Sequence, residues 1–159
     1  KDRSENLMIV DLLRNDLSKT CTQVAVPKLF ELQSFANVHH LVSTVTAQLR
    51  PSADAVDLLA GCFPGGSITG APKIRAMEII EELEATRRSA YCGSLGYISA
   101  DGNMDTNIAI RTLVCDRGRI HCWGGGGIVT DSVPENEYEE SVKKVQLLMD
   151  TLENAFGEG

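Results

Sequence analysis

Residues 119–150 read RIHCWGGGGIVTDSVPENEYEESVKKVQLLMD, and this stretch holds a strand, a glycine run and a helix in turn. Residues 119–123 have the composition of a strand. The four glycines at 124–127 then interrupt it, which favours a place where a ligand approaches the backbone closely, or else a bulge or crowded crossing. Pro134 is typical of a helix start. Apolar residues then recur at intervals of four and three, which predicts a buried face: Tyr138, Val142, Val145, Met149, Leu152 and Phe156.

The segments before this stretch alternate between helix and strand patterns. Helices are predicted at residues 4–17 and 54–62, and from Pro72 to about residue 84. Strands are predicted at residues 41–49, 90–99 and 107–115, with turns at Asp101-Gly102 and Arg117-Gly118. Residues 21–35 mix strand and loop, and Pro27 limits any strand there to an edge. The length of 159 residues suggests one domain, residues 1–159.

Composition excludes several classes of function. Fifteen Lys and Arg against 22 Asp and Glu give a net charge of −7, so a nucleic-acid partner is not expected. The longest apolar run is only four residues, 7–10, and therefore no membrane span is expected. The five cysteines include no C-x-x-C pair, which indicates free thiols in a reducing, cytoplasmic compartment.

Two helices carry carboxylates that need an explanation. Glu137, Glu140 and Lys144 form a narrow stripe along the edge of the buried face of the last helix; the plainer interpretation is a solvated Glu140–Lys144 pair. Glu5 lies on the same side as Ile9 in a largely apolar helix. It therefore needs a basic side chain or a cation as partner, unless it serves only as a first-turn carboxylate.

Three further segments offer candidate binding groups. Arg111 shares the apolar face of the predicted strand 107–115 and could bind a carboxylate, or else pair with Asp105 or Asp116. His39 and His40 alternate, so at most one points into a site. The loop 63–70 precedes a helix and could attract an anion, but it lacks the Lys-Ser/Thr of a nucleotide-binding P-loop. Its hydroxyls have no His and acid at a spacing typical of serine hydrolases.

Together these segments resemble the chorismate-utilising enzymes. Six matching runs occur in the family's order and cover nearly the whole chain: 5–16 (ENLMIVDLLRND), 38–43 (VHHLVS), 63–73 (FPGGSITGAPK), 102–106 (GNMDT) with 110–112 (IRT), 125–129 (GGGIV), and 131–135 (DSVPE) with 137–140 (EYEE). The resemblance implies an α+β fold, with layered sheets packed between helices, of which this chain would be the C-terminal half.

The resemblance also implies a role for each candidate residue. Glu5 and Glu140 match the family's magnesium-binding glutamates, and Glu137 matches an acidic neighbour that helps hold the water shell of the metal. Mg²⁺ would bridge these residues to the ring carboxylate of chorismate. The residues that match contacts to the carboxylates of chorismate are Tyr91, Arg111, Gly125, Gly126, Gly127, Lys144, Ser67 and Thr69. His40 matches a histidine beside the leaving 4-hydroxyl, and it is the one residue given a catalytic role.

Residues 38–44 and 91–97 resemble most the branch of the family that aminates chorismate at C4, the component I enzymes of aminodeoxychorismate synthesis for para-aminobenzoate and folate. Anthranilate synthase component I, an enzyme of tryptophan biosynthesis, is the alternative. The resemblance implies ammonia supply by a glutamine amidotransferase subunit. The family motif with the distinguishing lysine or alanine would lie upstream of Lys1, so this chain alone is expected to be inactive. A non-catalytic fragment that self-associates is the alternative from another class.

Overall fold

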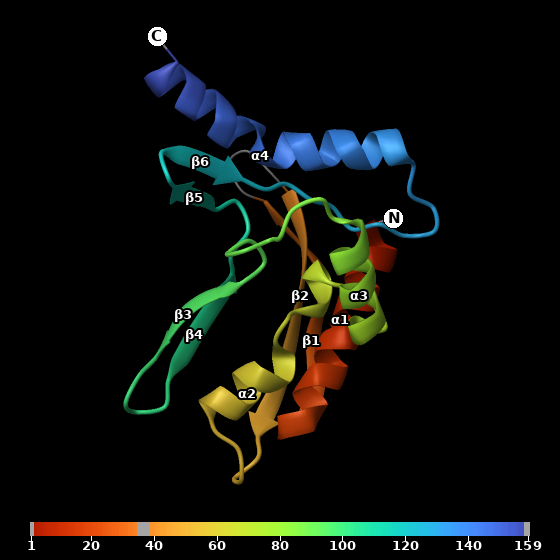
Figure 1. The fold of residues 1–159 in the computed structure, drawn as a ribbon. Helices are drawn as coiled ribbons and strands as arrows, with labels where there is room; N and C mark the ends of the chain where they lie inside the picture. Colours follow the sequence, from red (N-terminus) through yellow and green to blue (C-terminus); the bar gives the residue numbers. More distant parts are fainter. Residues whose placement is uncertain (1, 35–38, 158–159) are drawn as a thin grey trace. The chain divides into compact units, whose positions relative to one another are not determined.

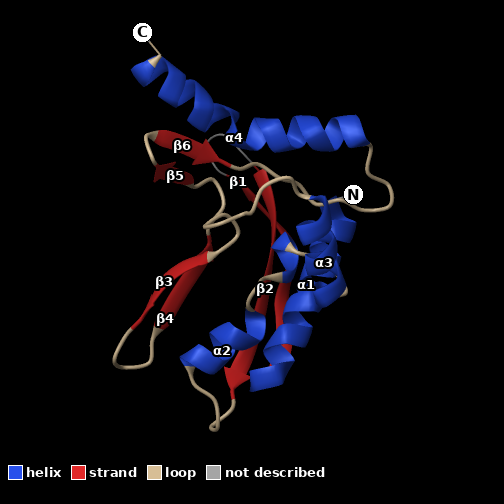
Figure 2. Ribbon diagram, viewed as in Figure 1, coloured by secondary structure: helices blue, strands red, loops and turns tan. Residues whose placement is uncertain are grey.

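The computed structural model describes residues 2–34 and 39–157, so Val38 of the motif 38–43 lies outside the described residues. Figures 1 and 2 draw the helices and strands of the chain, and contacts divide it into two compact units. Unit 1 comprises residues 1–85 and 96–106, and unit 2 comprises residues 86–95 and 107–159. That all 159 residues form one functional domain stays a prediction. None of the helices in the described ranges is both long enough and apolar enough to cross a membrane.

A helix and a long two-stranded ribbon make up most of unit 1. Helix α1 (Asp2–Thr20) leads directly into β1 (Cys21–Ser34), which pairs antiparallel with β2 (His39–Leu49). The register runs from Cys21 opposite Leu49 to Ser34 opposite His39, with three irregularities. Pro27 lies among them, in a strand paired on one side only, as predicted for a residue that has no N–H to donate. Helix α1 packs along both strands (Figure 1).

Three short elements follow in unit 1. Helix α2 (Ala55–Cys62) begins at a capping box, in which the Asp54 side chain accepts from the backbone of Val56 and Asp57 while Asp57 accepts from the Asp54 N–H. A short 3₁₀ helix, η1 (Gly66–Ile68), lies inside the predicted glycine-rich loop. Helix α3 (Lys73–Leu83) follows Pro72 directly. Helices α2 and α3 confirm the predicted helices to within a few residues.

A buried carboxylate links these elements. Asp16 of α1 is 3% exposed and accepts hydrogen bonds from Lys19 Nζ at 2.7 Å and from Lys73 Nζ, at the start of α3, at 2.6 Å. Lys19 also donates to the carbonyl of Gly61 in α2. Two lysines pair with the buried carboxylate, which would be unfavourable to bury alone. Asp16 and Lys19 together therefore connect α1 to α2 and α3.

Cys62 lies at the end of α2 within this charged environment. Burial raises the pKa of the Cys62 thiol, and the negative charges of Asp16 and Cys21 raise it further. Because the thiolate is the reactive form, we expect Cys62 to react with iodoacetamide at pH 8 several times more slowly than the exposed Cys115. Peptide mapping after timed labelling checks this. Equal rates in the folded chain would contradict it, whereas equal rates in urea are expected.

Two hairpins follow, and they correct one prediction. Strand β3 (Ser94–Ile98) pairs with β4 (Met104–Ile108), and β5 (Leu113–Asp116) pairs with β6 (Arg119–Cys122) through the predicted Arg117-Gly118 turn, where both residues have positive φ. The prediction of one continuous strand over residues 107–115 is wrong. The chain breaks after β4, where the amide of Ile110 bonds to the carbonyl of Ile108.

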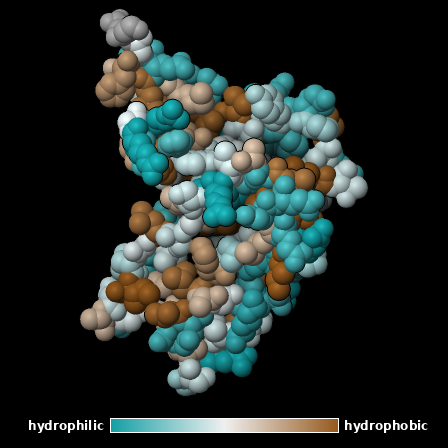
Figure 3. Space-filling model, viewed as in Figure 1, coloured by the Kyte–Doolittle hydropathy of each residue, from teal (hydrophilic) through white to brown (hydrophobic). Residues whose placement is uncertain are grey.

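Helix α4 (Pro134–Phe156) begins at the predicted proline, but its apolar face is only partly covered. Val145 is buried, whereas Tyr138 and Phe156 are 72% and 78% exposed. A continuous buried face is therefore wrong. In the described part of the chain, the buried hydrophobic residues are Val10, Cys21, Cys92 and Val145, and many large apolar side chains reach the surface (Figure 3). Such surface is compatible with self-association, which stays a prediction.

Candidate functional site

The glycine run of unit 2 lies directly against helix α4. A β-carbon at Gly124 would overlap the backbone carbonyl oxygen of Ser141 and would lie 3.3 Å from the Val145 side chain. Only a residue without a side chain permits this approach. The run is therefore a crowded crossing, one of the two interpretations left open by the sequence, and the crossing brings the next glycines to the first turns of α4.

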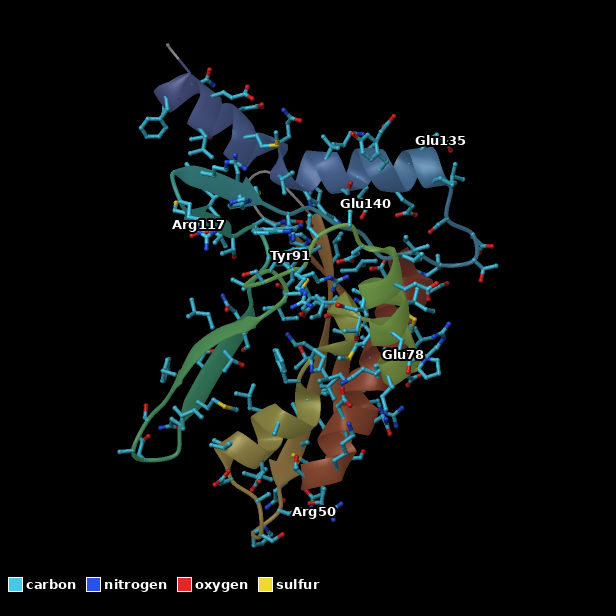
Figure 4. The ribbon with its side chains drawn as sticks, viewed as in Figure 1. Arg50, Glu78, Tyr91, Arg117, Glu135 and Glu140 are labelled. Carbon is cyan, nitrogen blue, oxygen red and sulfur yellow. The ribbon has the colours of Figure 1, made fainter. Side chains whose placement is uncertain are left out.

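Two carboxylates of α4 face Gly126. A β-carbon there would lie 3.4 Å from Glu137 Oε2 and 3.5 Å from Glu140 Oε1. Glu137 is 9% exposed, and Glu140 is half-buried. The two residues are three positions apart, so they share one face of the helix, and Figure 4 shows Glu140 on the side of α4 along which the glycine run passes. The two carboxylates of the predicted stripe, Glu137 and Glu140, therefore both lie next to Gly126.

Lys144 joins this helix face to the glycine run. Its Nζ donates to Glu140 Oε1 at 2.6 Å and to the carbonyl oxygen of Gly125 at 3.1 Å. The ion pair is the one that spacing predicts, but the contact with the backbone is additional. The Lys144 ammonium therefore fixes the orientation of the Gly125–Gly126 peptide, whose N–H points away from the lysine in a trans peptide.

Tyr91 approaches the same run from another segment of unit 2. Its hydroxyl oxygen lies 2.8 Å from the point that a β-carbon of Gly125 would occupy. The backbone N–H of Tyr91 donates to the carbonyl of Arg88, which closes a turn. Tyr91, Gly125, Gly126, Glu137, Glu140 and Lys144 thus form one cluster, which we call the glycine-run site.

The glycine-run site has the donor chemistry that a hard cation requires. Two carboxylates over an open glycine match the oxygen ligands that Mg²⁺ prefers. Across the described residues, no group of three or more His, Cys, Asp or Glu side chains is arranged to hold a metal ion. Magnesium binding, and Glu5 as its third carboxylate, therefore stay predictions.

Arg111 takes a conformation that the sequence did not indicate. It lies between β4 and β5 with φ of 50° and is exposed, so it does not share a strand face with Ala109 and Leu113. Left-handed φ is uncommon for arginine, and at functional sites such conformations re-aim a side chain. The face assigned to Arg111 is wrong, whereas its role as a carboxylate ligand stays a prediction.

Glu5 and His40 come to the same end of unit 1. Asn6, next to Glu5, donates from Nδ2 to the carbonyl of Leu41, next to His40, at 3.0 Å. Ser43 Oγ donates to Asn6 Oδ1 at 2.6 Å, and it accepts from the backbone N–H of Phe30. This network fixes the start of α1 against β2. It thereby holds together the segments that carry Glu5 and His40, whose roles stay predictions.

The loop with Ser67 and Thr69 packs on the middle of α1. A β-carbon at Gly66 would lie 2.7 Å from Leu12 Cδ1, so glycine is required there. Thr69 Oγ1 donates to the carbonyl of Gly65 at 2.9 Å, whereas Ser67 is exposed on η1. The proposed anion contacts of Ser67, Thr69 and Gly127 stay predictions.

Sequence reasoning missed how Tyr91 is held. The Tyr91 and Trp123 rings are stacked, with centroids 6.2 Å apart and planes 9° apart. The His121 ring stacks in turn on Trp123, with centroids 5.8 Å apart. The Arg88 guanidinium carbon lies 5.9 Å from the centre of the Tyr91 ring. The chain's single tryptophan beside the glycine run was the only signal available, and it does not identify its partners.

Comparison with known proteins identifies what the chain resembles. A family described as chorismate binding enzyme matches residues 1–150. Aminodeoxychorismate synthase component 1 of Escherichia coli is 59% identical over 155 residues, which cover 96% of this chain and 34% of that protein. Anthranilate synthase component 1 of Aquifex aeolicus is 50% identical over 157 residues, 98% of this chain and 32% of the relative. The chain spans about a third of the length of these curated relatives.

A solved structure confirms the fold class. Anthranilate synthase component I of Streptococcus pneumoniae superposes with a TM-score of 0.82 at 44% identity, covering 90% of this chain and 33% of that one. The mixed helix-and-sheet architecture predicted from the sequence is therefore confirmed.

Proposed function

The chain belongs to the chorismate binding enzyme family, and on that premise we propose that it is part of an enzyme that replaces the 4-hydroxyl of chorismate with ammonia. The product would be 4-amino-4-deoxychorismate. Four relatives named aminodeoxychorismate synthase component 1 are 51–59% identical to the chain, whereas those named anthranilate synthase component 1 are 48–50% identical. This difference favours C4 amination over anthranilate formation.

The observation that carries the proposal is the convergence of Glu137, Glu140, Lys144 and Tyr91 on Gly125 and Gly126. Chorismate has two carboxylates, and an acidic chain repels a dianion unless positive charge is concentrated locally. A carboxylate pair supports cation binding, while a tyrosine hydroxyl and glycine amides suit an oxygen acceptor.

Each side chain has a proposed task. Glu137 and Glu140 would hold Mg²⁺, which when bound neutralises the ring carboxylate and stabilises charge as the hydroxyl leaves. Tyr91 would donate to the enolpyruvyl carboxylate, together with the amides of Gly126 and Gly127. Lys144 keeps the Gly125 carbonyl turned away from that anion, because an acceptor there would repel it.

The remaining assignments rest on family membership. His40 would lie near the departing 4-hydroxyl, and Arg111 would bind a carboxylate. A glutamine amidotransferase subunit would supply the ammonia. The five cysteines, all within the described part of the chain, form no disulfide, which supports function in a reducing, cytoplasmic compartment.

The product of the reaction tests the proposal. We expect a chimera, in which this chain replaces the matching third of the Escherichia coli relative, to form 4-amino-4-deoxychorismate from chorismate, Mg²⁺ and ammonium. The 159-residue chain alone should show no turnover. Mass spectrometry of the reaction mixture identifies the product, because anthranilate and aminodeoxychorismate differ in mass.

The unmodified Escherichia coli protein is the control for assembly and assay. A chimera that forms no 4-amino-4-deoxychorismate, under conditions in which the unmodified protein does, would refute the proposal that this chain completes a C4-aminating site. Turnover by the isolated chain at the rate of the chimera would refute its role as an incomplete catalytic portion.

A further inference from the structure

An ordered stack of side chains extends away from the glycine-run site within unit 2. It runs from Arg88 to Tyr91, then to Trp123 and His121, and each neighbouring pair is 5.8–6.2 Å apart. Nearly parallel rings at such separations form an offset stack, and a guanidinium within about 6 Å of a ring centre is attracted to its face. Both types of contact restrict the rotation of the Tyr91 ring.

Tyr91 belongs both to the stack, through its ring, and to the glycine-run site, through its hydroxyl oxygen. Tyr91 is half-buried, and its hydroxyl oxygen occupies the space beside Gly125. Trp123 directly precedes the glycine run, so the ring that packs on Tyr91 belongs to the backbone that its hydroxyl approaches. Arg88 lies in the same turn as Tyr91, through the bond from the Tyr91 N–H to its carbonyl. Trp123 and Arg88 therefore both restrict the position of the Tyr91 ring, and with it the position of the hydroxyl.

We propose that Arg88 and Trp123 are positioning residues that hold the Tyr91 hydroxyl against Gly125. A hydroxyl fixed in this way would bind a carboxylate of chorismate without having to reorganise first. This consequence for substrate binding rests on the proposed function. The placement of the hydroxyl itself is independent of any substrate. The two parts are therefore tested separately.

A double-mutant cycle on this chain tests the placement without ligand. In Gly125→Ala, the new methyl group lies 2.8 Å from the tyrosine oxygen, so one of them must move. In the wild-type chain, where the stack holds Tyr91, Gly125→Ala should lower the midpoint of urea unfolding. In a Trp123→Ala background the Tyr91 ring can turn away, so the same substitution should lower the midpoint much less. Equal shifts in both backgrounds would overturn the proposal, since coupled residues are not additive.

The spectrum of Trp123 gives a second readout. Because Trp123 is the only tryptophan, the tryptophan band of the near-ultraviolet circular dichroism reports the packing of this one ring. Tyr91→Leu and Arg88→Leu should reduce this signal, whereas Tyr138→Leu, which removes an exposed tyrosine of the same unit, should not. An unchanged signal in Tyr91→Leu would overturn the stack.

The chimera tests the consequence for substrate. Trp123→Ala should raise the KM for chorismate about two- to tenfold, the range corresponding to one aromatic pair, with little change in kcat. Trp123→Phe should restore it, since a flat ring remains. An unchanged KM in Trp123→Ala would overturn this part. Failure of the proposed function would instead appear as a chimera that makes no aminodeoxychorismate, with the ligand-free cycle unaffected.

Discussion

Replacing Glu140 with Gln is expected to reduce the magnesium-dependent rate of the chimera by at least about 100-fold, because even partners outside a coordination sphere change affinity or activity by 10–100-fold. The substitution keeps the shape of the side chain and an oxygen that can accept from Lys144, but it removes the negative charge facing Gly126 and with it the ion pair to Lys144. The rate at increasing Mg²⁺ concentration measures the effect, and the half-saturating concentration should rise.

The neighbouring glutamate provides a matched control. Glu139 pairs with Lys143 at 3.3 Å, as Glu140 pairs with Lys144, but both members of the Glu139–Lys143 pair are exposed. Glu139→Gln should therefore leave the magnesium dependence unchanged, since exposed pairs of this spacing contribute only about 0.3–0.5 kcal/mol. Wild-type behaviour of Glu140→Gln, or an equal loss in Glu139→Gln, would refute Glu140 as a metal ligand.

Local sequence signals predicted most of the elements correctly. The start of α4 at Pro134, the short helix α2 predicted from residue 54 and the Arg117-Gly118 turn each depend on a few adjacent residues. The stripe of Glu137, Glu140 and Lys144 was equally predictable, because helical geometry alone brings these positions to one face.

Features that depend on contacts between distant segments could not be predicted in this way. The break after β4 turns Arg111 into a left-handed conformation, although the composition of residues 107–115 favours a strand. The exposure of Tyr138 has the same origin, since periodicity predicts an apolar face but does not provide a partner to cover it. Likewise, nothing in the spacing relates Arg88 to Trp123, which lie far apart in the chain.

Gly124→Ala is expected to lower the free energy of unfolding by about 3 kcal/mol, the upper part of the usual range for forcing extra atoms into a packed contact. The added carbon would meet the carbonyl oxygen of Ser141, which belongs to the backbone of α4 and cannot rotate away. Either the glycine run separates from the helix or the helix bends. Urea titration followed by circular dichroism measures the change.

Gly61→Ala separates this steric effect from the general effect of replacing glycine. A β-carbon at Gly61 would make only an ordinary contact, 3.6 Å from Thr20, and the residue lies inside α2, where alanine is favoured by about 1 kcal/mol. The two identical substitutions should thus act with opposite signs. If Gly124→Ala also stabilises the chain, the run does not lie against α4. In that case Glu137 and Glu140 would not face Gly126, and the site would lose its geometric basis.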